Sequence, residues 1–310
     1  MAFVMLVSLY KNNIMKAMTK LIPIICLFVI IGGSLLYSCS QEKKKETAIV
    51  LPLEAALSQA GENRVELEKV LHRYQSNPSD SLKYRAACFL IENMPSYTYY
   101  KGKLLEQYLT FFTLLQEARS KKVYPQAMID SIRRMYGPFS LDSLQYCKDV
   151  LTVDSAYLCN NIDWAFKVWQ EQPWGKNVSF DDFCEYILPY RIGDETLSYW
   201  REDIYRKYNP LLDSLCASTV LDIEDPLVAA RCLCDSLRKR SRFFTTTVPQ
   251  GLPHVGPEIA QSVSGSCREL SDYVVYVCRA LGIPCAIDFM PLHGGGNDGH
   301  QWVSFTDKYG

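Results

Sequence analysis

The sequence predicts an α+β protein in which a long helical region precedes a smaller core of helix and antiparallel sheet. Apolar residues recur at helical spacing through most of the first two thirds of the chain, with prolines between the runs. After Ser264 a helix that begins at a cysteine is followed by Gly-Ile-Pro, an apolar strand and a second strand headed by a histidine. We therefore expect a helical domain over residues 47–220 and a helix-and-sheet domain over residues 221–310.

Amphipathic stripes justify the helices of the first domain, which we expect to be all-helical. Two of these stripes are formed by Leu67, Val70, Leu71 and Tyr74, and by Leu104, Leu105, Tyr108, Leu109, Phe112 and Leu115. Further helical patterns run near residues 80–93, 126–135, 155–171, 195–206 and 226–240. No fixed repeat period connects them, so the pattern does not predict a solenoid.

Cys267 begins the helix of the second domain and is the candidate nucleophile. The apolar positions after it recur with helical period and place Cys267 on the buried stripe, at the first turn; they are Leu270, Val274, Val277 and Leu281. Unpaired N–H groups and the positive end of the helix dipole favour a thiolate there. His300 can complete a thiolate–imidazolium pair if the fold brings it close, acting as general base and then as general acid.

Three motifs in this region resemble the transglutaminase-like superfamily of thiol enzymes. They are Gly265-Ser266-Cys267, Arg279-Ala280-Leu281-Gly282-Ile283-Pro284 and His300-Gln301-Trp302-Val303. The resemblance covers roughly the last third of the chain. It implies a papain-like core of helix and antiparallel sheet, a Cys-His-Asp triad, and acyl transfer through a thioester that is released to an amine or to water.

The third member of the triad should be a carboxylate that orients the imidazole. In the family it lies on the strand antiparallel to the histidine strand. Asp307 is expected in the turn between those strands, and Asp288 on the preceding strand is only a substitute. The residue opposite His300 would follow it by roughly fifteen positions, so we expect the triad Asp and the last strands of the sheet beyond Gly310.

Gln261 is a candidate donor to the oxyanion. It stands six residues before Cys267, which resembles the spacing of the papain-type glutamine, and a solvated loop glutamine is the alternative. The backbone N–H of Cys267 would be the other donor. Trp302 is expected to pack beneath the site.

The remaining cysteines and histidines are interpreted as structural. Cys278 and Cys285 lie in apolar runs and are expected in the core. His293 stands beside Gly294-Gly295-Gly296 and is expected in a flexible loop, and His72 and His254 have no partner motif. The chain holds twelve cysteines but neither a Cys-x-x-Cys pair nor a metal-ligand spacing. We expect mostly free, buried thiols, no metal and no cofactor.

The N-terminus predicts export and a lipid anchor. Lys16 and Lys20 precede the apolar run Leu21–Leu36, which at about sixteen residues is short for a membrane span. The following Leu36-Tyr37-Ser38-Cys39 resembles a bacterial lipoprotein box in which the cysteine is lipidated. We expect a signal peptide over residues 1–38 and a tether over 39–46, in the cell envelope; a single transmembrane anchor is the alternative.

Two classes of function remain open. The first is an exported thiol acyl-transfer enzyme that acts on protein or peptide substrates, more by hydrolysis than by cross-linking. The second is a non-catalytic lipoprotein that binds peptide or glycan on an aromatic face, with residues such as Tyr97, Trp164 and Trp174. Around these, Tyr190-Arg191 and Asp194-Glu195 form either a polar rim or a solvated turn. The net charge of −1 gives no reason to expect nucleic acid as a partner.

Overall fold

The protein is an α+β fold in which helices predominate and two small antiparallel sheets are separate. The computed structural model describes residues 52–107, 109–110, 114, 127, 130–131, 134–135, 139–239, 251–257, 260, 265–292 and 299–309. The expected signal peptide and tether, Cys39, Gln261 and His293 lie outside the described residues.

The bounds of the elements follow the sequence patterns closely in most places. The helices are α2 (Pro52–Gln59), α3 (Arg64–Gln75), α4 (Ser81–Asn93), α7 (Ser155–Glu171), α8 (Phe180–Asp182), α9 (Arg201–Tyr208), α10 (Asp213–Cys216), α11 (Pro226–Arg238) and α13 (Cys267–Ala280). A π-helical turn, Phe183–Ile187, continues α8. The strands are β1 (Thr98–Lys101), β2 (Gln145–Lys148), β3 (Cys285–Met290) and β4 (His300–Phe305). Short 3₁₀ turns are Gly61–Asn63, Pro78–Asp80, Met94–Ser96, Leu141–Ser143, Asp149–Leu151, Pro173–Asn177 and Asn209–Leu212.

The predicted helices near 80–93, 155–171 and 226–240 are confirmed as α4, α7 and α11. The helix expected from residue 195 begins only at Arg201. The reason is local. The carboxylate of Glu195 folds back to accept the N–H groups of Ile192 and Gly193, both at 2.8 Å, so this stretch forms a turn.

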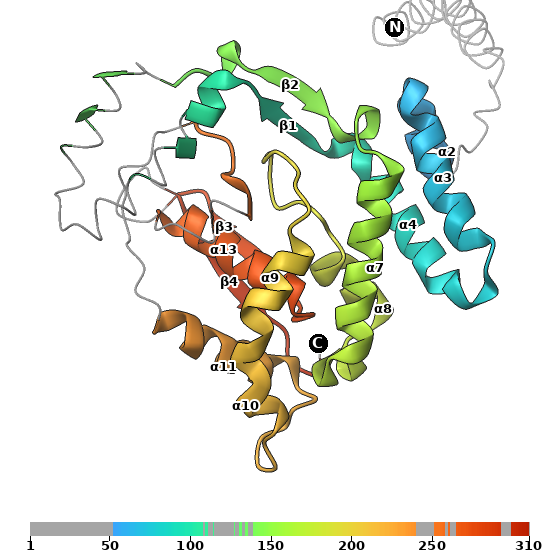
Figure 1. Cartoon of the computed structure of the whole chain (residues 1–310), viewed down its shortest axis with the longest axis vertical. Helices are drawn as coiled ribbons and strands as arrows, with labels where there is room; N and C mark the ends of the chain where they lie inside the picture. The colour runs from blue at the N-terminus through green and yellow to red at the C-terminus, as the bar shows by residue number, and fades with distance from the viewer. Residues whose placement is uncertain are drawn as a thin grey trace, which may run out of the picture. The chain divides into compact units, whose positions relative to one another are not determined.

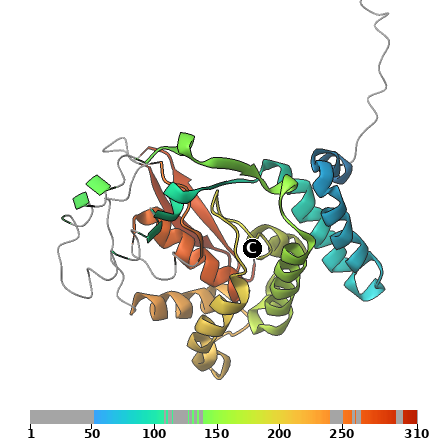
Figure 2. The same cartoon turned by 45° about the horizontal axis from the view of Figure 1, so that its top comes forward.

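Two hydrophobic cores lie within one compact unit of the described chain. The first core contains buried residues between Ala56 and Tyr190, and α3 and α4 pack on α7 there. The second core gathers α9, α11 and α13, and it also takes up Trp174. In Figures 1 and 2, α2, α3 and α4 lie at one side of α7, and α9 and α13 lie at the other. α9 packs on α13, and Leu215 of α10 belongs to the same core, although both helices precede residue 220.

The region expected as a helical domain, residues 47–220, is not all-helical, because β1 and β2 form an antiparallel sheet within it. Thr98 pairs with Lys148, and Lys101 pairs with Gln145. Aromatic and β-branched residues favour strands, and β1 reads Thr-Tyr-Tyr-Lys. Local periodicity did not predict this sheet, since the two strands are far apart in the sequence.

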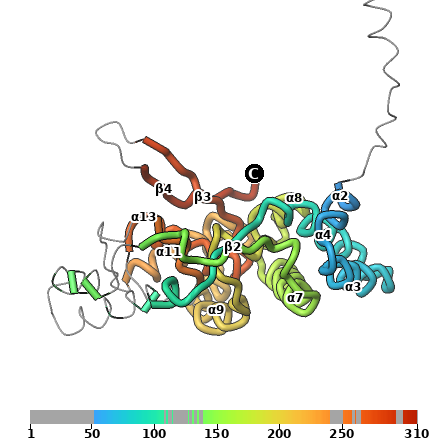
Figure 3. Tube along the Cα trace, turned by 90° about the horizontal axis from the view of Figure 1, so that it is seen from above, coloured from blue at the N-terminus to red at the C-terminus, as the bar shows by residue number. Residues whose placement is uncertain are grey.

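The second sheet is a pair of antiparallel strands against α13. Cys285 pairs with Phe305 and Met290 pairs with His300, so the predicted strand after Gly-Ile-Pro and the histidine strand are both confirmed. Ile287, Val303 and Phe305 pack against the second core. Figure 3 shows the far ends of β3 and β4 extending away from α13.

Within the described part of the chain, no helix combines the length and apolar character that crossing a membrane requires.

Candidate active site

The start of α13 is built around Cys267. The helix begins at this residue, as the sequence predicts, and Ser266 is its N-cap. The Ser266 hydroxyl accepts the N–H of Arg268 at 3.3 Å, and Glu269 accepts the N–H of Ser266 at 2.8 Å. This is a capping box, in which two otherwise unpaired donors are satisfied reciprocally. It fixes the direction in which the chain enters the helix.

Gly265 is required by that capping box. A Cβ at this position would lie 2.5 Å from Cβ of Glu269 and 2.8 Å from its Oε2. Any side chain larger than hydrogen would displace the carboxylate that caps the helix. The first glycine of the Gly-x-Cys motif therefore serves the geometry of the helix start.

Cys267 is half-buried at the start of α13. Among the described residues, no hydrogen bond uses its backbone N–H, because the first N–H groups of a helix have no intrahelical acceptor. An open N–H beside a thiol is the donor that a tetrahedral oxyanion needs. The second proposed donor, Gln261, lies outside the described residues.

A buried carboxylate near the start of α13 offsets the effect of the helix dipole on the Cys267 thiol. Glu269 is only 2 % exposed and stands two residues after Cys267. Its own burial disfavours ionisation, but Arg268 and the hydrogen bonds from Ser266 outweigh this and lower the pKa of Glu269. Arg268 Nε donates to Glu269 at 3.0 Å and balances the charge. The environment of the thiol thus depends on paired charges as well as on the helix terminus.

The second motif anchors α13 to the helical region. Arg279 donates to the carbonyl oxygens of Tyr186 at 3.2 Å and of Arg191 at 2.8 Å. Trp174 Nε1 donates to the carbonyl of Leu281 at 3.1 Å. Gly282 has φ of +71° and lies so close to α7 that a Cβ would be 2.9 Å from the carbonyl oxygen of Val168. The motif is therefore a docking element that holds α13 in place.

The third motif places its glutamine, and not its histidine, toward α13. Gln301 Nε2 donates to the carbonyl of Arg268 at 3.3 Å, in the first turn of the helix. Side chains alternate along a strand, so His300 and Trp302 share the opposite face of β4. Both are exposed, with ring centroids 5.8 Å apart.

The structure therefore brings the strand of His300 beside Cys267 but shows no contact between their side chains among the described residues. The catalytic pairing of Cys267 with His300 stays a prediction. The expectation for Trp302 was wrong: it is 43 % exposed instead of packed beneath the site. Val303 and Phe305 occupy the inner face of β4 in its place.

The two aspartates near the histidine strand have structural partners. Asp307 accepts the N–H of Tyr309 at 2.8 Å, which confirms it as a turn residue. Asp288 lies opposite Trp302 in the sheet and accepts the hydroxyl of Ser304. Among the described residues, no carboxylate contacts the imidazole of His300.

The cysteines expected in the core are confirmed there. Cys278 and Cys285 are 0 % and 1 % exposed. A hydrogen bond to Cys285, together with burial, raises the pKa of Cys278 far above that of a free thiol. Cys267 differs from both in being half-buried at a helix start. The described cysteines are all free, and no cluster of metal-ligating side chains occurs in the described part of the chain.

A buried network of charges lies beside α13, which sequence patterns did not predict. Arg191 donates to both carboxylate oxygens of Asp149, at 2.7 and 2.8 Å. Tyr276 of α13 donates to Glu195 at 2.7 Å. Tyr190, Arg191 and Glu195 are each at most 5 % exposed, so they form neither a polar rim nor a solvated turn. The lone sequence signal was the density of polar residues in Arg191–Glu195.

His254 also belongs to this region, although it was interpreted as structural. Its Nδ1 lies 2.7 Å from Oδ2 of Asp272 in α13, and its backbone N–H donates to Asp194 at 2.8 Å. Asp272 is 1 % exposed. The signal that could have indicated this pair is an aspartate inside an otherwise apolar helical run.

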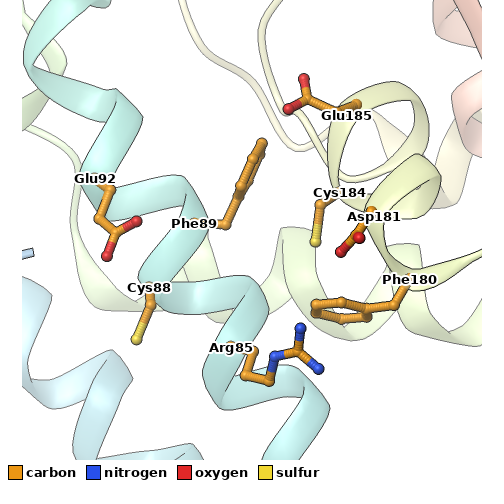
Figure 4. Close-up of a pocket in the computed structure, with 8 residues that line it drawn as sticks. All are labelled: Arg85, Cys88, Phe89, Glu92, Phe180, Asp181, Cys184 and Glu185. Atoms are coloured by element: carbon orange, nitrogen blue, oxygen red, sulfur yellow. The ribbon is translucent and has the colours of Figure 1, made fainter. Parts of the chain in front are cut away.

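A groove elsewhere in the protein has a cavity volume of about 360 Å³ and involves none of the three motifs. Figure 4 shows it between α4 and α8, with side chains from both helices around it. Its lining residues are Arg85, Cys88, Phe89, Glu92, Phe180, Asp181, Cys184 and Glu185. Arg85 stacks over Phe180 at 4.3 Å. Burial raises the pKa of Cys184 to about 12, so its thiol is a poor nucleophile.

Comparison with known proteins agrees with the motifs. The model of the transglutaminase-like superfamily, described as its core, matches residues 213–310, roughly the last third of the chain. No curated protein and no solved structure matched the chain.

Proposed function

Because residues 213–310 match the model of the transglutaminase-like superfamily, we propose that this protein is a thiol acyl-transfer enzyme with Cys267 as its nucleophile. The observation that carries the proposal is the position of Cys267 at the first residue of α13, where its backbone N–H has no acceptor among the described residues. The capping box and the anchoring of Arg279 and Gly282 hold that position rigidly. Preorganised donors of this kind stabilise an oxyanion without reorganisation.

The reaction would proceed in two steps. The thiolate of Cys267 attacks the carbonyl carbon of an amide, and the amide nitrogen leaves with a proton from the imidazolium of His300. A thioester on Cys267 remains. Water then gives a proton to the imidazole, attacks the thioester and releases the acid and the thiol. His300 is proposed for this role because Gln301, its neighbour in β4, is hydrogen-bonded to the first turn of α13.

Hydrolysis is the favoured outcome. A protein at the cell surface meets water at high concentration, and none of the three motifs contains a separate site for an amine acceptor. The alternative, a non-catalytic lipoprotein with an aromatic binding face, loses support from packing. Trp174 is 0 % exposed, and Trp169 stacks on Phe183 with ring centroids 4.5 Å apart. Both tryptophan rings pack in the hydrophobic cores and are not free to form a binding face.

Selective alkylation tests the nucleophile. At about pH 6, where an ordinary thiol with a pKa near 8.5 is almost wholly protonated, Cys267 should react with iodoacetamide at least about tenfold faster than Cys88 or Cys278. His300→Ala should slow Cys267 by removing the positive partner. Mass-spectrometric mapping of the adducts over time measures each rate separately.

Cys216 is the matched control, because the residue is exposed to reagent. Partial desolvation of its thiol and the charge of Asp213 raise the pKa of Cys216. Reaction at Cys216 should not respond to His300→Ala. Equal rates at Cys267 and Cys216 at this pH would mean that Cys267 is an ordinary thiol, and the enzyme proposal would be given up.

We also propose that the protein is anchored to a bacterial cell envelope through a lipid on Cys39. A basic segment, an apolar run and small residues before a cysteine support this proposal. A protein or peptide near the membrane would then be the substrate.

Metabolic labelling with a fatty acid tests the anchor. We expect label in the wild-type protein and none in Cys39→Ala, because no other cysteine follows such a segment. Cys26→Ala, within the apolar run, is the matched control and should keep its label. Label that survives in Cys39→Ala would contradict the lipoprotein proposal.

A further inference from the structure

Asp272 is a buried carboxylate that the stability of the fold does not explain. It is 1 % exposed, and its Oδ1 has no hydrogen-bond partner among the described residues. A buried polar atom without a partner costs free energy, and an apolar side chain of similar size would avoid that cost. Such a group calls for a functional reason.

His254 is the cation that balances this carboxylate. Its Nδ1 lies 2.7 Å from Oδ2 of Asp272. Burial disfavours the charged imidazole, but the hydrogen bond to Asp272 and its charge outweigh this and raise the pKa of His254. The ring also lies directly against Gly193, where a Cβ would be 2.2 Å from its Cδ2. The pair is thus held between α13 and the turn that contains Gly193.

The pair lies close to the nucleophile. Asp272 follows Cys267 by five residues, which is about 7.5 Å along the helix axis. Arg268 donates to the carbonyl of Leu252 at 2.8 Å, so the segment before His254 packs along the first turns of α13. Five residues also turn the helix by about 140°, so the two side chains lie farther apart than this rise. Because Asp272 is 1 % exposed, its charge is screened less by water than a surface charge and can act on the thiol over such a distance.

Other charges around the pair are already matched. Glu269 is paired with Arg268, and Glu195 faces Arg191 and accepts the hydroxyl of Tyr276. Asp194 accepts the backbone N–H of His254 and is half-buried. The charge on Asp272 is therefore left to His254 alone among the described cations.

We propose that His254 is a positioning residue for the nucleophile, whose imidazolium balances Asp272 and thereby allows Cys267 to form a thiolate. The proposal rests on the proposed role of Cys267. While His254 is protonated, the pair is neutral. When His254 loses its proton, Asp272 leaves a net negative charge beside the first turns of α13, and a negative charge disfavours a thiolate.

His254→Asn tests this, because the amide can still donate to Asp272 but carries no charge. Iodoacetamide rates at Cys267 and Cys216 would be measured between about pH 5 and 9. The rate at Cys267 near pH 6 should fall about tenfold. The double substitution His254→Asn with Asp272→Asn removes the unbalanced charge and should restore the rate to within about threefold of wild type.

His72→Asn, at an exposed histidine of α3, is the matched control and should leave Cys267 unchanged. If His254→Asn does not fold, Asp272→Asn alone replaces it as the test variant. Its amide can donate to a neutral imidazole, and Cys267 should stay reactive. An unaltered pH profile in folded His254→Asn, or a shift that persists in the double variant, would overturn the inference. Failure of the proposed function is separate: it would appear in the wild type, as Cys267 reacting no faster than Cys216.

Discussion

Arg201→Ala should lower the free energy of unfolding by about 4 kcal/mol or more, since losses of this size arise when a buried hydrogen-bond network is broken. The guanidinium is 3 % exposed. It donates to the carbonyls of Ile187 at 2.7 Å and Arg279 at 3.1 Å, and to Oδ1 of Asn161 at 2.6 Å. Among the described residues, no carboxylate pairs with it.

The absence of a countercharge makes the site dependent on those oxygens. Burial, with a smaller contribution from Arg279, lowers the pKa of Arg201 to about 9. Truncation would leave several buried acceptors without a donor, at about 1–3 kcal/mol each. The carbonyl of Leu188 also accepts from Arg201, at 2.9 Å. It would keep a donor in the variant, because Asn161 donates to the same oxygen at 2.9 Å.

Urea unfolding followed by circular dichroism measures the change. Arg206→Ala is the matched control in the same helix, because the Arg206 side chain is 72 % exposed and its ion-pair partner among the described residues is Glu202. Its expected cost is about 0.5 kcal/mol or less. If the two variants lost similar stability, the buried hydrogen bonds of Arg201 would contribute no more than the exposed ion pair of Arg206.

Gly282→Ala should cost about 2–4 kcal/mol of unfolding free energy, from two causes that add. The residue has φ of +71°, where a side chain is strained. Its Cβ would also lie 2.9 Å from the carbonyl oxygen of Val168, which is helix backbone and cannot rotate away. Thermal or urea unfolding would quantify the loss.

Gly251→Ala separates the two causes. Gly251 has φ of +77°, but a Cβ there meets no atom of the described residues within 4 Å. It should therefore show only the conformational part, about 1–2 kcal/mol. An equal loss in both variants would show that the close approach of Gly282 to α7 contributes nothing.

Local patterns predicted the elements whose causes are local. The helix at Cys267, the strand after Pro284 and the turn at Asp307 each depend on residues that are near neighbours in the sequence. The pairing of β1 with β2 could not be predicted in this way, because each strand offers only four residues and its partner is remote.

The position of Cys267 at a helix start was predicted, but its surroundings were not. Charged residues such as Arg191 and Glu195 resemble surface residues until their partners are known. The outward orientation of His300 did carry a signal. Val303 and Phe305 share a face with Gln301, and that apolar alternation leaves His300 on the other side.

The anchoring of α13 through Arg279, Leu281 and Gly282 has a consequence for how the protein could have evolved. The segment that matches the superfamily begins at residue 213, yet its core is completed by Trp174 and by α9. The start of the matched segment, residue 213, is therefore not the boundary of a unit that has its own complete core. A recombination event that exchanged only residues 213–310 would transfer α13 without Trp174 and α9, against which it packs. Duplication or transfer of this gene region should preserve both parts together, as a single inherited unit.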